Sequence, residues 1–286
     1  MQSKIFSVNK TLNVRGRVLD LTEPKIMGIL NVTPDSFYDG LKYTDEKSIL
    51  KQIEKMVSEG ADFIDVGGNS TRPGAENISE KEELARVLPA IKTISKNFPT
   101  AIISIDTFRA SVARHAVEEG ASIVNDISGG DLDSNMFETI AALQVPYILM
   151  HMKGTPQTMM KEAVYKNLLK EIIDYFHQKI VRLHLLGIKD IIIDPGFGFA
   201  KTVGQNFILL NNLNRFEIIE KPMLVGLSRK SMIWRTLETS PEGALNGTTA
   251  LNTIALMGGA SILRVHDVRE AKEVIQLVQQ TRMFTT

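Results

Sequence analysis

The chain has 286 residues, of which 43% are hydrophobic and 23% charged, as is typical of a globular protein with a sizeable core. Its 33 Lys and Arg residues balance its 33 Asp and Glu residues, so no overall positive charge favours binding to nucleic acid or to an anionic membrane. It has no cysteine, which excludes disulfides and thiolate metal sites and permits a reducing cytoplasm.

The N-terminal 24 residues contain only short apolar pieces separated by Lys and Arg, unlike the continuous apolar core of a signal peptide. No later run approaches the roughly 20 apolar residues that are needed to span a bilayer. We therefore expect a soluble, cytoplasmic protein. Within this first segment, Ile5–Leu21 alternates weakly between apolar and polar residues around Arg15-Gly16, which predicts a β-hairpin.

Short, non-alternating apolar runs then recur along the chain. Runs of this length and composition are typical of parallel strands that are buried on both faces. The predicted strands are Ile26–Val32, Phe63–Val66, Ile102–Ile105, Ser122–Val124, Tyr147–Met150, Ile191–Ile193, Met223–Leu227 and Ile262–Val265.

Amphipathic stretches separate several of these runs. Many end at a glycine, and one begins with the capping-box pattern Ser79-Glu80-Lys81-Glu82, so they are predicted to be helices. The predicted helices are Asp45–Glu59, Ser79–Ile94, Phe108–Glu119, Lys161–Leu186, Ala244–Met257 and Val268–Gln279.

Eight strands alternating with helices in a chain of this length predict an α/β fold, a single (β/α)8 TIM barrel. We expect one domain over residues 1–286, in which residues 1–24 form an N-terminal β-hairpin across the bottom of the barrel and residues 25–286 form the barrel. The alternative is an open, doubly wound sheet. That fold commonly carries a glycine-rich dinucleotide-binding motif after its first strand, and the chain has none.

Polar side chains follow nearly every predicted strand. In a TIM barrel the carboxyl ends of the strands and the loops after them form the active site. Burying so many polar groups at one rim is costly unless they bind a ligand or each other. The segments are Asn31–Phe37, Asn69–Gly74, Asp106-Thr107, Asn125-Asp126, His151, Asp194–Gly196, Ser228–Ser231 and Arg264–Asp267.

From about Lys25 to Val274 the chain resembles dihydropteroate synthases, and the matching segments occur in the family's order. Asn69 stands where the family usually has Glu, and Ala200 where it usually has Gly, which bears on loop conformation. The segments that carry the resemblance are Gly28–Phe37, Asn69–Ala75, Ser104–Thr107, Asn125–Gly130, Asp194–Phe199, Leu227–Ser231 and Arg264–Val268.

The resemblance implies an enzyme of folate biosynthesis and a target of sulfonamides. It would transfer a pterinylmethyl group from (7,8-dihydropterin-6-yl)methyl diphosphate to p-aminobenzoate and release pyrophosphate, with Mg2+ as cofactor. These two small molecules are the expected partners, with no nucleic acid and no membrane. The residues leave the oligomeric state open, including a homodimer.

The resemblance also assigns residues to the pterin. Asp194 would accept two adjacent N–H groups, a strong charge-assisted pair. Asp106 and Asn125 would contact the ring nitrogens, and Lys230 the carbonyl. The structural alternatives are that Asp194 only caps the turn at Pro195-Gly196 and that strand-end Asp and Asn residues only cap helices.

For the leaving group, the resemblance indicates Arg264 and His266, which point the same way along one strand, together with Asn31 and Arg72. Asn31 would also be the one protein ligand of Mg2+, a normal arrangement when phosphate and water complete the shell. Asp106, Lys230, Arg264 and His266 are the expected catalytic residues. The expected p-aminobenzoate contacts are Thr71, Arg72, Pro73, Phe199 and Ser231.

Three other functions stay open at this stage. A non-catalytic pterin-binding relative would keep Asp194 and lose the first two loops. A methyltransferase domain working with a cobalamin partner would lack the Ser70–Gly74 loop and the Lys230-Ser231 pair, and both are present. A generic phosphate-binding barrel is preferred only if Asp106, Asn125 and Asp194 do not converge.

Overall fold

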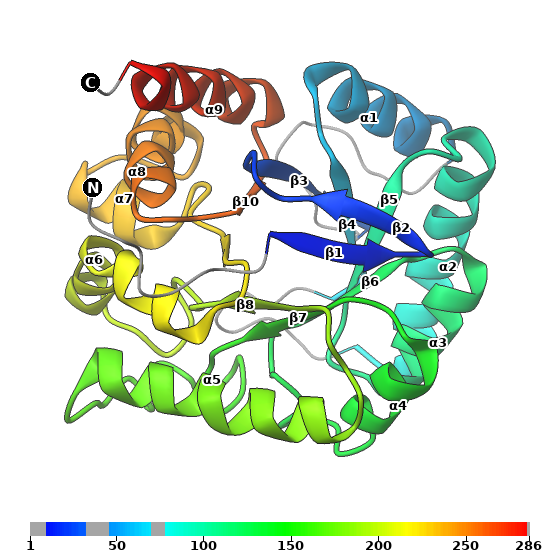
Figure 1. Cartoon of the computed structure of the whole chain (residues 1–286). Coiled ribbons are helices and arrows are strands. Elements are labelled where there is room, and N and C mark those ends of the chain that lie inside the picture. Colours follow the sequence, from blue (N-terminus) through cyan, green and yellow to red (C-terminus); the bar gives the residue numbers. More distant parts are fainter. Residues whose placement is uncertain (1–9, 33–45, 70–77, 285–286) are drawn as a thin grey trace.

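The fold is a ring of parallel strands inside a ring of helices, as Figure 1 shows in a view along the barrel axis. The computed structural model describes residues 10–32, 46–69 and 78–284. Eight parallel strands form one sheet in the order β8-β7-β6-β5-β4-β3-β10-β9. Their bounds are β3 Lys25–Asn31, β4 Phe63–Gly67, β5 Ile102–Asp106, β6 Ile123–Asp126, β7 Tyr147–Met150, β8 Ile191–Asp194, β9 Leu224–Val225 and β10 Ile262–Val265.

The ring closes between β8 and β9 through a single bridge. Ile193 pairs with Met223 there, and the Ile193 N–H donates to the carbonyl of Pro222 at 2.9 Å. Every other neighbouring pair of strands forms a ladder of at least two residues. The predicted (β/α)8 barrel is therefore confirmed, and the open doubly wound sheet is wrong.

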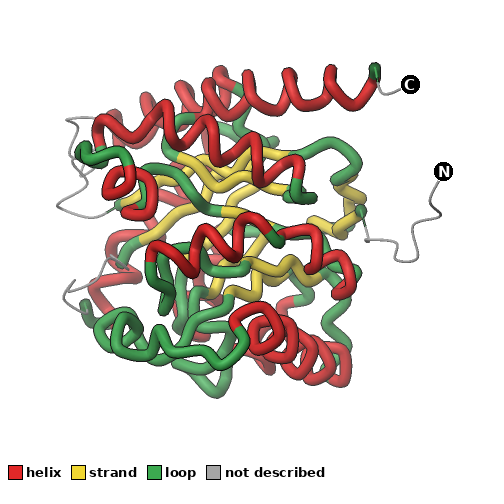
Figure 2. The backbone as a smooth tube through the Cα atoms, turned by 90° about the vertical axis from the view of Figure 1, so that its left-hand side faces the viewer, coloured by secondary structure: helices red, strands yellow, loops and turns green. Residues whose placement is uncertain are grey.

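The helices lie outside the strands, and Figure 2 shows the strands enclosed between them in a side view. The predicted helix at Lys161–Leu186 starts too early, because the Glu171 carboxylate accepts from the N–H groups of Lys166 and Asn167 and Asn167 caps the helix. Helices α4, α6 and α7 were not predicted. The helices are α1 Glu46–Glu59, α2 Glu80–Asn97, α3 Ala110–Glu119, α4 Met136–Leu143, α5 Leu168–Leu185, α6 Val203–Asn211, α7 Ser231–Thr236, α8 Leu245–Met257 and α9 Val268–Met283, with 3-10 turns η1 Leu213–Ile219 and η2 Glu242–Ala244.

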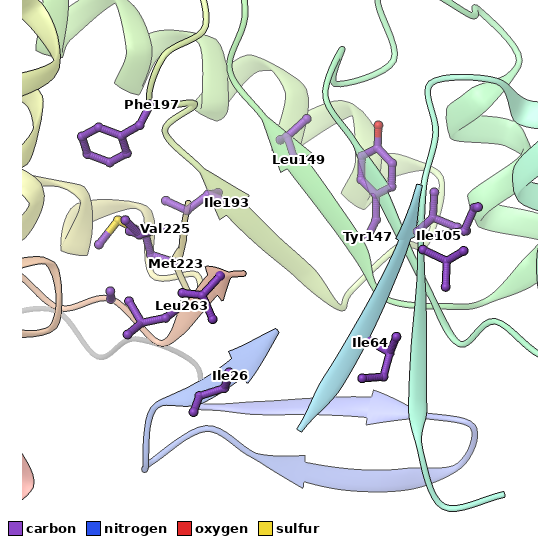
Figure 3. Packing of buried hydrophobic residues seen from close by; sticks show 14 of the residues in the cluster. Ile26, Ile64, Ile105, Tyr147, Leu149, Ile193, Phe197, Met223, Val225 and Leu263 are labelled. Carbon is purple, nitrogen blue, oxygen red and sulfur yellow. The ribbon is translucent and has the colours of Figure 1, made fainter. Parts of the chain in front are cut away.

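The main core fills the space between strands and helices. Successive side chains of a strand point to opposite faces, so every second strand residue faces outward. Figure 3 shows Ile26, Ile64 and Leu263 among these outward-facing side chains, which come from strands far apart in the sequence. None of the helices in residues 46–69 and 78–284 is long and apolar enough to cross a membrane.

The predicted hairpin is confirmed over the residues that the structure describes. Strands β1 (Thr11–Val14) and β2 (Arg17–Asp20) pair antiparallel around Arg15-Gly16. The hairpin crosses one end of the barrel in Figure 1. Its buried side chains join the lowest inward-facing layer of the strands in one apolar cluster: Leu12, Val14, Leu21, Met27, Phe63, Ile123, Ile148, Ile192, Leu224 and Ile262.

We expect Leu12→Ala to lower the free energy of unfolding by about 2–5 kcal/mol, because it opens a cavity in this sealed layer. Val18→Ala is the matched control on the same hairpin, since Val18 is 76% exposed. Denaturant unfolding of both variants measures the effect. Equal stability of the two variants would show that the hairpin does not seal the barrel.

Candidate active site

A polar layer lies two residues above the apolar layer that seals the barrel. Alternation along the strands turns the same face inward every second residue. Counting two residues on from Phe63, Ile102, Ile123, Ile192 and Ile262 reaches Asp65, Ser104, Asn125, Asp194 and Arg264. The barrel is thus apolar at its hairpin end and polar toward the carboxyl ends of the strands, where TIM-barrel enzymes bind substrates.

Arg264 joins two carboxylates in this layer. Its Nε donates to Asp65 Oδ2 at 2.6 Å, and one Nη donates to Asp106 Oδ2 at 2.7 Å. Burial raises the pKa of Asp106 to about 7, although Arg264 acts in the opposite direction. Burial alone would lower the pKa of Arg264, but the carboxylates of Asp65 and Asp106 raise it above its ordinary value. The guanidinium is therefore fixed and charged at the centre of the layer.

Asn125 belongs to the same network. Its Nδ2 donates to Asp65 Oδ2 at 3.0 Å, so one oxygen of Asp65 accepts from both Asn125 and Arg264. The other oxygen of Asp65 is buried and has no hydrogen-bond partner among the described residues. Asp65 thus orients both an amide and a guanidinium toward the barrel interior.

Asp194 ends β8 and begins a tight turn. Its Oδ1 accepts from the Gly196 N–H at 2.7 Å, so the turn-capping alternative is correct for that atom. No residue in the described ranges donates a hydrogen bond to Oδ2, which leaves it available to a ligand. Burial raises the pKa of Asp194, while Lys230 and Arg264 act in the opposite direction. The turn and the ligand-binding assignments are compatible, because they use different oxygens.

Lys230 faces Asp194 from the neighbouring loop. Its ammonium donates to the carbonyl of Phe197, and it lies 4.9 Å from the centre of the Phe199 ring. Burial lowers the pKa of Lys230 to about 8, with Asp194 as the largest opposing influence. A cation, an aromatic ring and a carboxylate therefore meet at the mouth of the barrel.

Asn31 ends β3 and lies next to Asp106 across Gly67. A Cβ on Gly67 would lie 3.5 Å from Asn31 Oδ1 and 3.6 Å from Asp106 Cβ. Glycine at this position therefore leaves space between the two side chains. Among the residues that the structure describes, no three His, Cys, Asp or Glu side chains form a group that could hold a metal ion.

His266 is held by Ser228 at the end of β10. Ser228 Oγ lies 3.1 Å from His266 Nδ1 and accepts from the His266 N–H at 3.2 Å. Beside them, Arg229 forms a two-pronged ion pair with Asp267, at 2.9 and 2.7 Å. Arg229 and Asp267 therefore tie the two loops together.

Comparison with known proteins agrees with this arrangement. The model of a family described as pterin binding enzyme matches residues 27–266. The dihydropteroate synthase of Escherichia coli (strain K12) is 43% identical over 94% of this chain and 96% of its own length. The chain belongs to the dihydropteroate synthase family. Members of this family are transferases, and so is this chain.

Solved dihydropteroate synthases share the whole fold. The Yersinia pestis enzyme in a sulfonamide drug complex has a TM-score of 0.91 and 41% identity, covering 96% of this chain and 99% of its own. The Xanthomonas albilineans enzyme with 4-aminobenzoic acid has a TM-score of 0.89 and 36% identity over the same shares of the two chains. The barrel described above is thus that of a dihydropteroate synthase from end to end.

The structure brings together most of the residues that the sequence assigned to the dihydropteroate synthase site. Asp106 bonds Arg264 directly, Asn125 meets Arg264 at their shared acceptor Asp65, and Asp194 faces Lys230. Asp106, Asn125 and Asp194 converge on one polar interior. A generic phosphate-binding barrel, which was preferred only if they did not converge, is therefore not preferred. Ser231 begins α7 directly after Lys230. Thr71, Arg72 and Pro73 lie outside the described residues, as do Thr33–Thr44 of the first loop.

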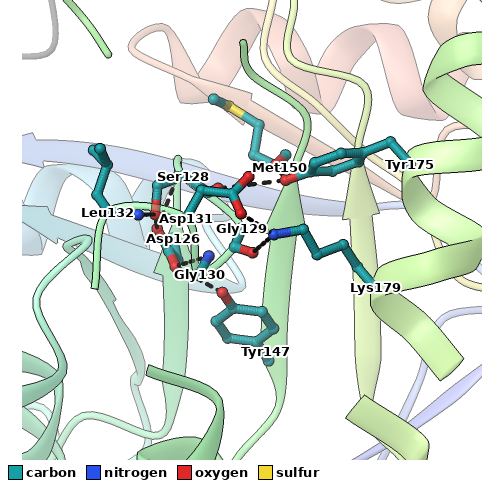
Figure 4. A network of polar contacts seen from close by, with 10 residues as sticks. All are labelled: Asp126, Ser128, Gly129, Gly130, Asp131, Leu132, Tyr147, Met150, Tyr175 and Lys179. Atoms are coloured by element: carbon teal, nitrogen blue, oxygen red, sulfur yellow. Dashed lines mark hydrogen bonds and ion pairs between the residues drawn. The ribbon is translucent and has the colours of Figure 1, made fainter. Parts of the chain in front are cut away.

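Asp126, next to Asn125, has a purely structural environment. Figure 4 shows its carboxylate accepting from the Ser128 backbone and hydroxyl and from Gly130 and Tyr147, at 2.7–2.8 Å. Both of its oxygens are therefore occupied. Of the segment Asn125–Gly130, only Asn125 belongs to the site, and Asp126 stabilises the loop that follows it.

Sequence reasoning missed Asp65, which is fully buried and orients Arg264. The signal was present, because a carboxylate in the middle of the apolar run Phe63–Val66 needs a buried partner. The structure does not explain the departure at Ala200. Ala200 has φ 47°, a left-handed conformation that glycine adopts more easily, so the usual glycine of the family fits the backbone at this position better.

Proposed function

We propose that this dihydropteroate synthase binds the pterin ring between Asp194 and Lys230. The observation that carries the proposal is that Asp194 uses one oxygen for its turn, while its other oxygen accepts no hydrogen bond from the described residues and the charge of Lys230 acts on this carboxylate. Two adjacent N–H groups of a pterin match the remaining acceptor capacity of a carboxylate, and charge-assisted bonds of this kind are strong. Lys230 then donates to the pterin carbonyl.

The polar network beneath them supports contacts to the rest of the ring. Asn125 has its amide nitrogen on Asp65 and its Oδ1 available as an acceptor. Asp106 and Arg264 lie on the other side of the same network. We assign Asn125 and Asp106 to the ring nitrogens and the planar guanidinium of Arg264 to stacking on the flat ring while it faces a phosphate.

We assign the pyrophosphate to Arg264, His266, Asn31 and Arg72. The oxygen of Asn31 is a hard donor suited to Mg2+, and Gly67 leaves room beside it for an ion. One or two protein oxygens with substrate phosphate and water are the usual magnesium shell. When bound, Mg2+ would neutralise charge on the departing pyrophosphate.

The acceptor p-aminobenzoate would lie at the mouth, against Phe199 and Ser231, with Thr71, Arg72 and Pro73 from the second loop. In the reaction the carbon–oxygen bond to pyrophosphate breaks, and a bond forms from the aniline nitrogen to the pterin methyl carbon. The nitrogen then loses one proton. Arg264 and His266 stabilise charge on the leaving group, and Asp106 and Asp194 stabilise cationic character that spreads into the ring.

The direct test is pyrophosphate release from (7,8-dihydropterin-6-yl)methyl diphosphate, measured with and without p-aminobenzoate. Release that depends on p-aminobenzoate and is inhibited by a sulfonamide supports the proposal. Release that is equally fast without an acceptor would mean that the site only hydrolyses the diphosphate. No release under either condition would leave a pterin-binding protein without this activity.

The charge of Lys230 should control pterin affinity at alkaline pH. Its pKa in the fold is about 8, so the donating ammonium is lost as the pH rises through that value. We expect the affinity for a pterin analogue to fall over this range. Lys230→Arg keeps its charge at these pH values and should remove this dependence, although its different shape weakens binding at every pH. Calorimetric titration across the range checks this, and an identical alkaline decline in both proteins would contradict the role of Lys230.

The order of binding is a further expectation. Pyrophosphate bound through Asn31 and Arg72 would organise the loops that supply the acceptor contacts. If the competent state makes up about 1% of the free enzyme, the apparent affinity for p-aminobenzoate is about 100-fold weaker without Mg2+ and pyrophosphate. Calorimetric titration of p-aminobenzoate with and without both decides this. Equal affinities would show that the acceptor site is preformed.

We also propose a cytoplasmic location, which rests on the absence of cysteine and on the substrates that the family uses. Fractionation of the source cells would test it. A homodimer stays a prediction, and light scattering of the purified chain would decide between a monomer and a dimer.

A further inference from the structure

A buried lysine, Lys201, lies under the turn that follows Asp194. Its side chain is 2% exposed, and its Nζ has three partners at 3.0 Å: the carbonyls of Gly196 and Phe199 and the Nδ1 of His151. An ammonium has three donors and no acceptor, so these partners use its full capacity. Lys201 therefore binds both ends of the turn that carries Phe199.

His151 is suited to accept from this lysine. It directly follows β7, the strand next to β8, and its backbone N–H donates to the Asp194 carbonyl at 2.9 Å. Burial lowers the pKa of His151 well below its ordinary value, with Lys201 as the next influence in the same direction, so the ring is neutral. A neutral imidazole has one ring nitrogen available as an acceptor.

The His151 ring is itself fixed from behind by Tyr175 of α5. The two rings pack edge to face with their centres 4.9 Å apart. The Tyr175 hydroxyl donates to the carbonyl of Met150 at 3.0 Å, a contact visible in Figure 4. Helix α5 therefore holds the His151 imidazole in place through the Tyr175 ring, and the imidazole contacts Lys201.

The start and the end of this turn have contacts of their own. Gly196 has φ +72°, and a Cβ at this position would clash with the His151 carbonyl, so the turn packs directly on the end of β7. Further along, the Tyr165 hydroxyl donates to the Ala200 carbonyl at 2.9 Å. Between these two ends, Lys201 bonds the carbonyl of Phe199 itself, so it fixes the part of the turn that carries the Phe199 ring.

We propose that Lys201, supported by His151, is a positioning residue that fixes the Phe199 ring for binding of the p-aminobenzoate acceptor. The inference rests on the proposed function, in which Phe199 contacts the acceptor. Lys201 itself touches neither substrate, because it is buried beneath the turn. Burial also lowers the pKa of Lys201 to about 7, with Asp194 as the largest opposing influence.

Lys201→Met tests the proposal, because it keeps the length of the side chain and removes its donors. We expect KM for p-aminobenzoate to rise about tenfold or more, the equivalent of one lost charge-assisted hydrogen bond, with a much smaller change in KM for the pterin substrate. Lys221→Met is the matched control, since Lys221 contacts His184 at 3.1 Å before β9, at the hairpin end of the barrel. The control should keep both KM values.

His151 provides a second pair of variants. The Oδ1 of His151→Asn lies near the place of Nδ1 and keeps an acceptor for the lysine, whereas His151→Leu removes it. We expect the leucine variant to raise KM for p-aminobenzoate and the asparagine variant to restore most of the loss. If Lys201→Met does not fold, this pair alone decides. Equal values in both His151 variants, or parallel changes in the two KM values, would overturn the positioning role.

Phe199→Ala separates this inference from the proposed function. If Phe199→Ala leaves KM for p-aminobenzoate unchanged, the assignment of Phe199 to the acceptor is wrong. If Phe199→Ala raises that KM and neither Lys201→Met nor His151→Leu does, Phe199 binds the acceptor and the positioning by Lys201 is wrong.

Discussion

Asp194→Asn is expected to weaken pterin binding by about 100-fold or more while the protein stays folded. The amide offers one acceptor and one donor to two ligand N–H groups, so it loses charge-assisted bonds and leaves a buried group unpaired, at a cost of about 3 kcal/mol or more. The turn survives, because the Asn Oδ1 still accepts from Gly196. Calorimetry with a pterin analogue measures the loss.

The thermal stability of Asp194→Asn should be unchanged or higher. Burial raises the pKa of Asp194 in the fold above its unfolded value, so the ionised form disfavours folding at neutral pH. An amide removes that penalty. Asp174→Asn, on the surface of α5, is the control and should change neither property. An unchanged dissociation constant in Asp194→Asn would remove this residue from the pterin site.

Arg264→Met is expected to have two separate effects. It leaves Asp65 and Asp106 buried without their cation, so we expect a loss of about 3–5 kcal/mol in the free energy of unfolding. It should also weaken pyrophosphate and the pyrophosphorylated pterin more than a bare pterin. Denaturant unfolding measures the first effect and calorimetry the second.

Two comparisons separate these effects. Arg269→Met removes an exposed arginine on α9 and should leave stability unchanged. His266→Ala lies outside the Asp65–Arg264–Asp106 network, so it should weaken the phosphate-bearing ligands with little change in stability. Equal losses for charged and uncharged pterins in both site variants would move Arg264 and His266 out of the phosphate pocket.

The barrel was predictable because its strands are short apolar runs that end in polar residues. The weaker helices were not. Helix α6 has Asn206 buried on its inner side, where it binds the turn after β8, and therefore lacks a clean apolar stripe. Helix α7 has only six residues and directly follows the active-site loop. Short elements that serve the site carry a weak periodic signal.

The site was predictable at strand ends and not below them. Asp194, Lys230 and Arg264 follow or end strands, so their positions indicated a site, and the resemblance to dihydropteroate synthases gave their roles. Asp65 lies within an apolar run and orients Arg264. Lys201 lies behind the turn that follows Asp194. Their roles depend on which strands become neighbours, and in the case of His151 and Lys201 the two residues are 50 positions apart in the chain. No local pattern contains that information.

The single bridge between β8 and β9 has a consequence for how a ligand acts on the whole molecule. Every other pair of neighbouring strands forms a ladder of backbone hydrogen bonds, so β8 and β9 are the strands that separate most easily. Asp194 ends β8, and Lys230 follows β9. A pterin bound by both residues would link β8 to β9, where the sheet itself has only one bridge. A bound pterin would then stabilise the barrel at its weakest strand pairing. Without a ligand, local opening of the sheet would begin between β8 and β9.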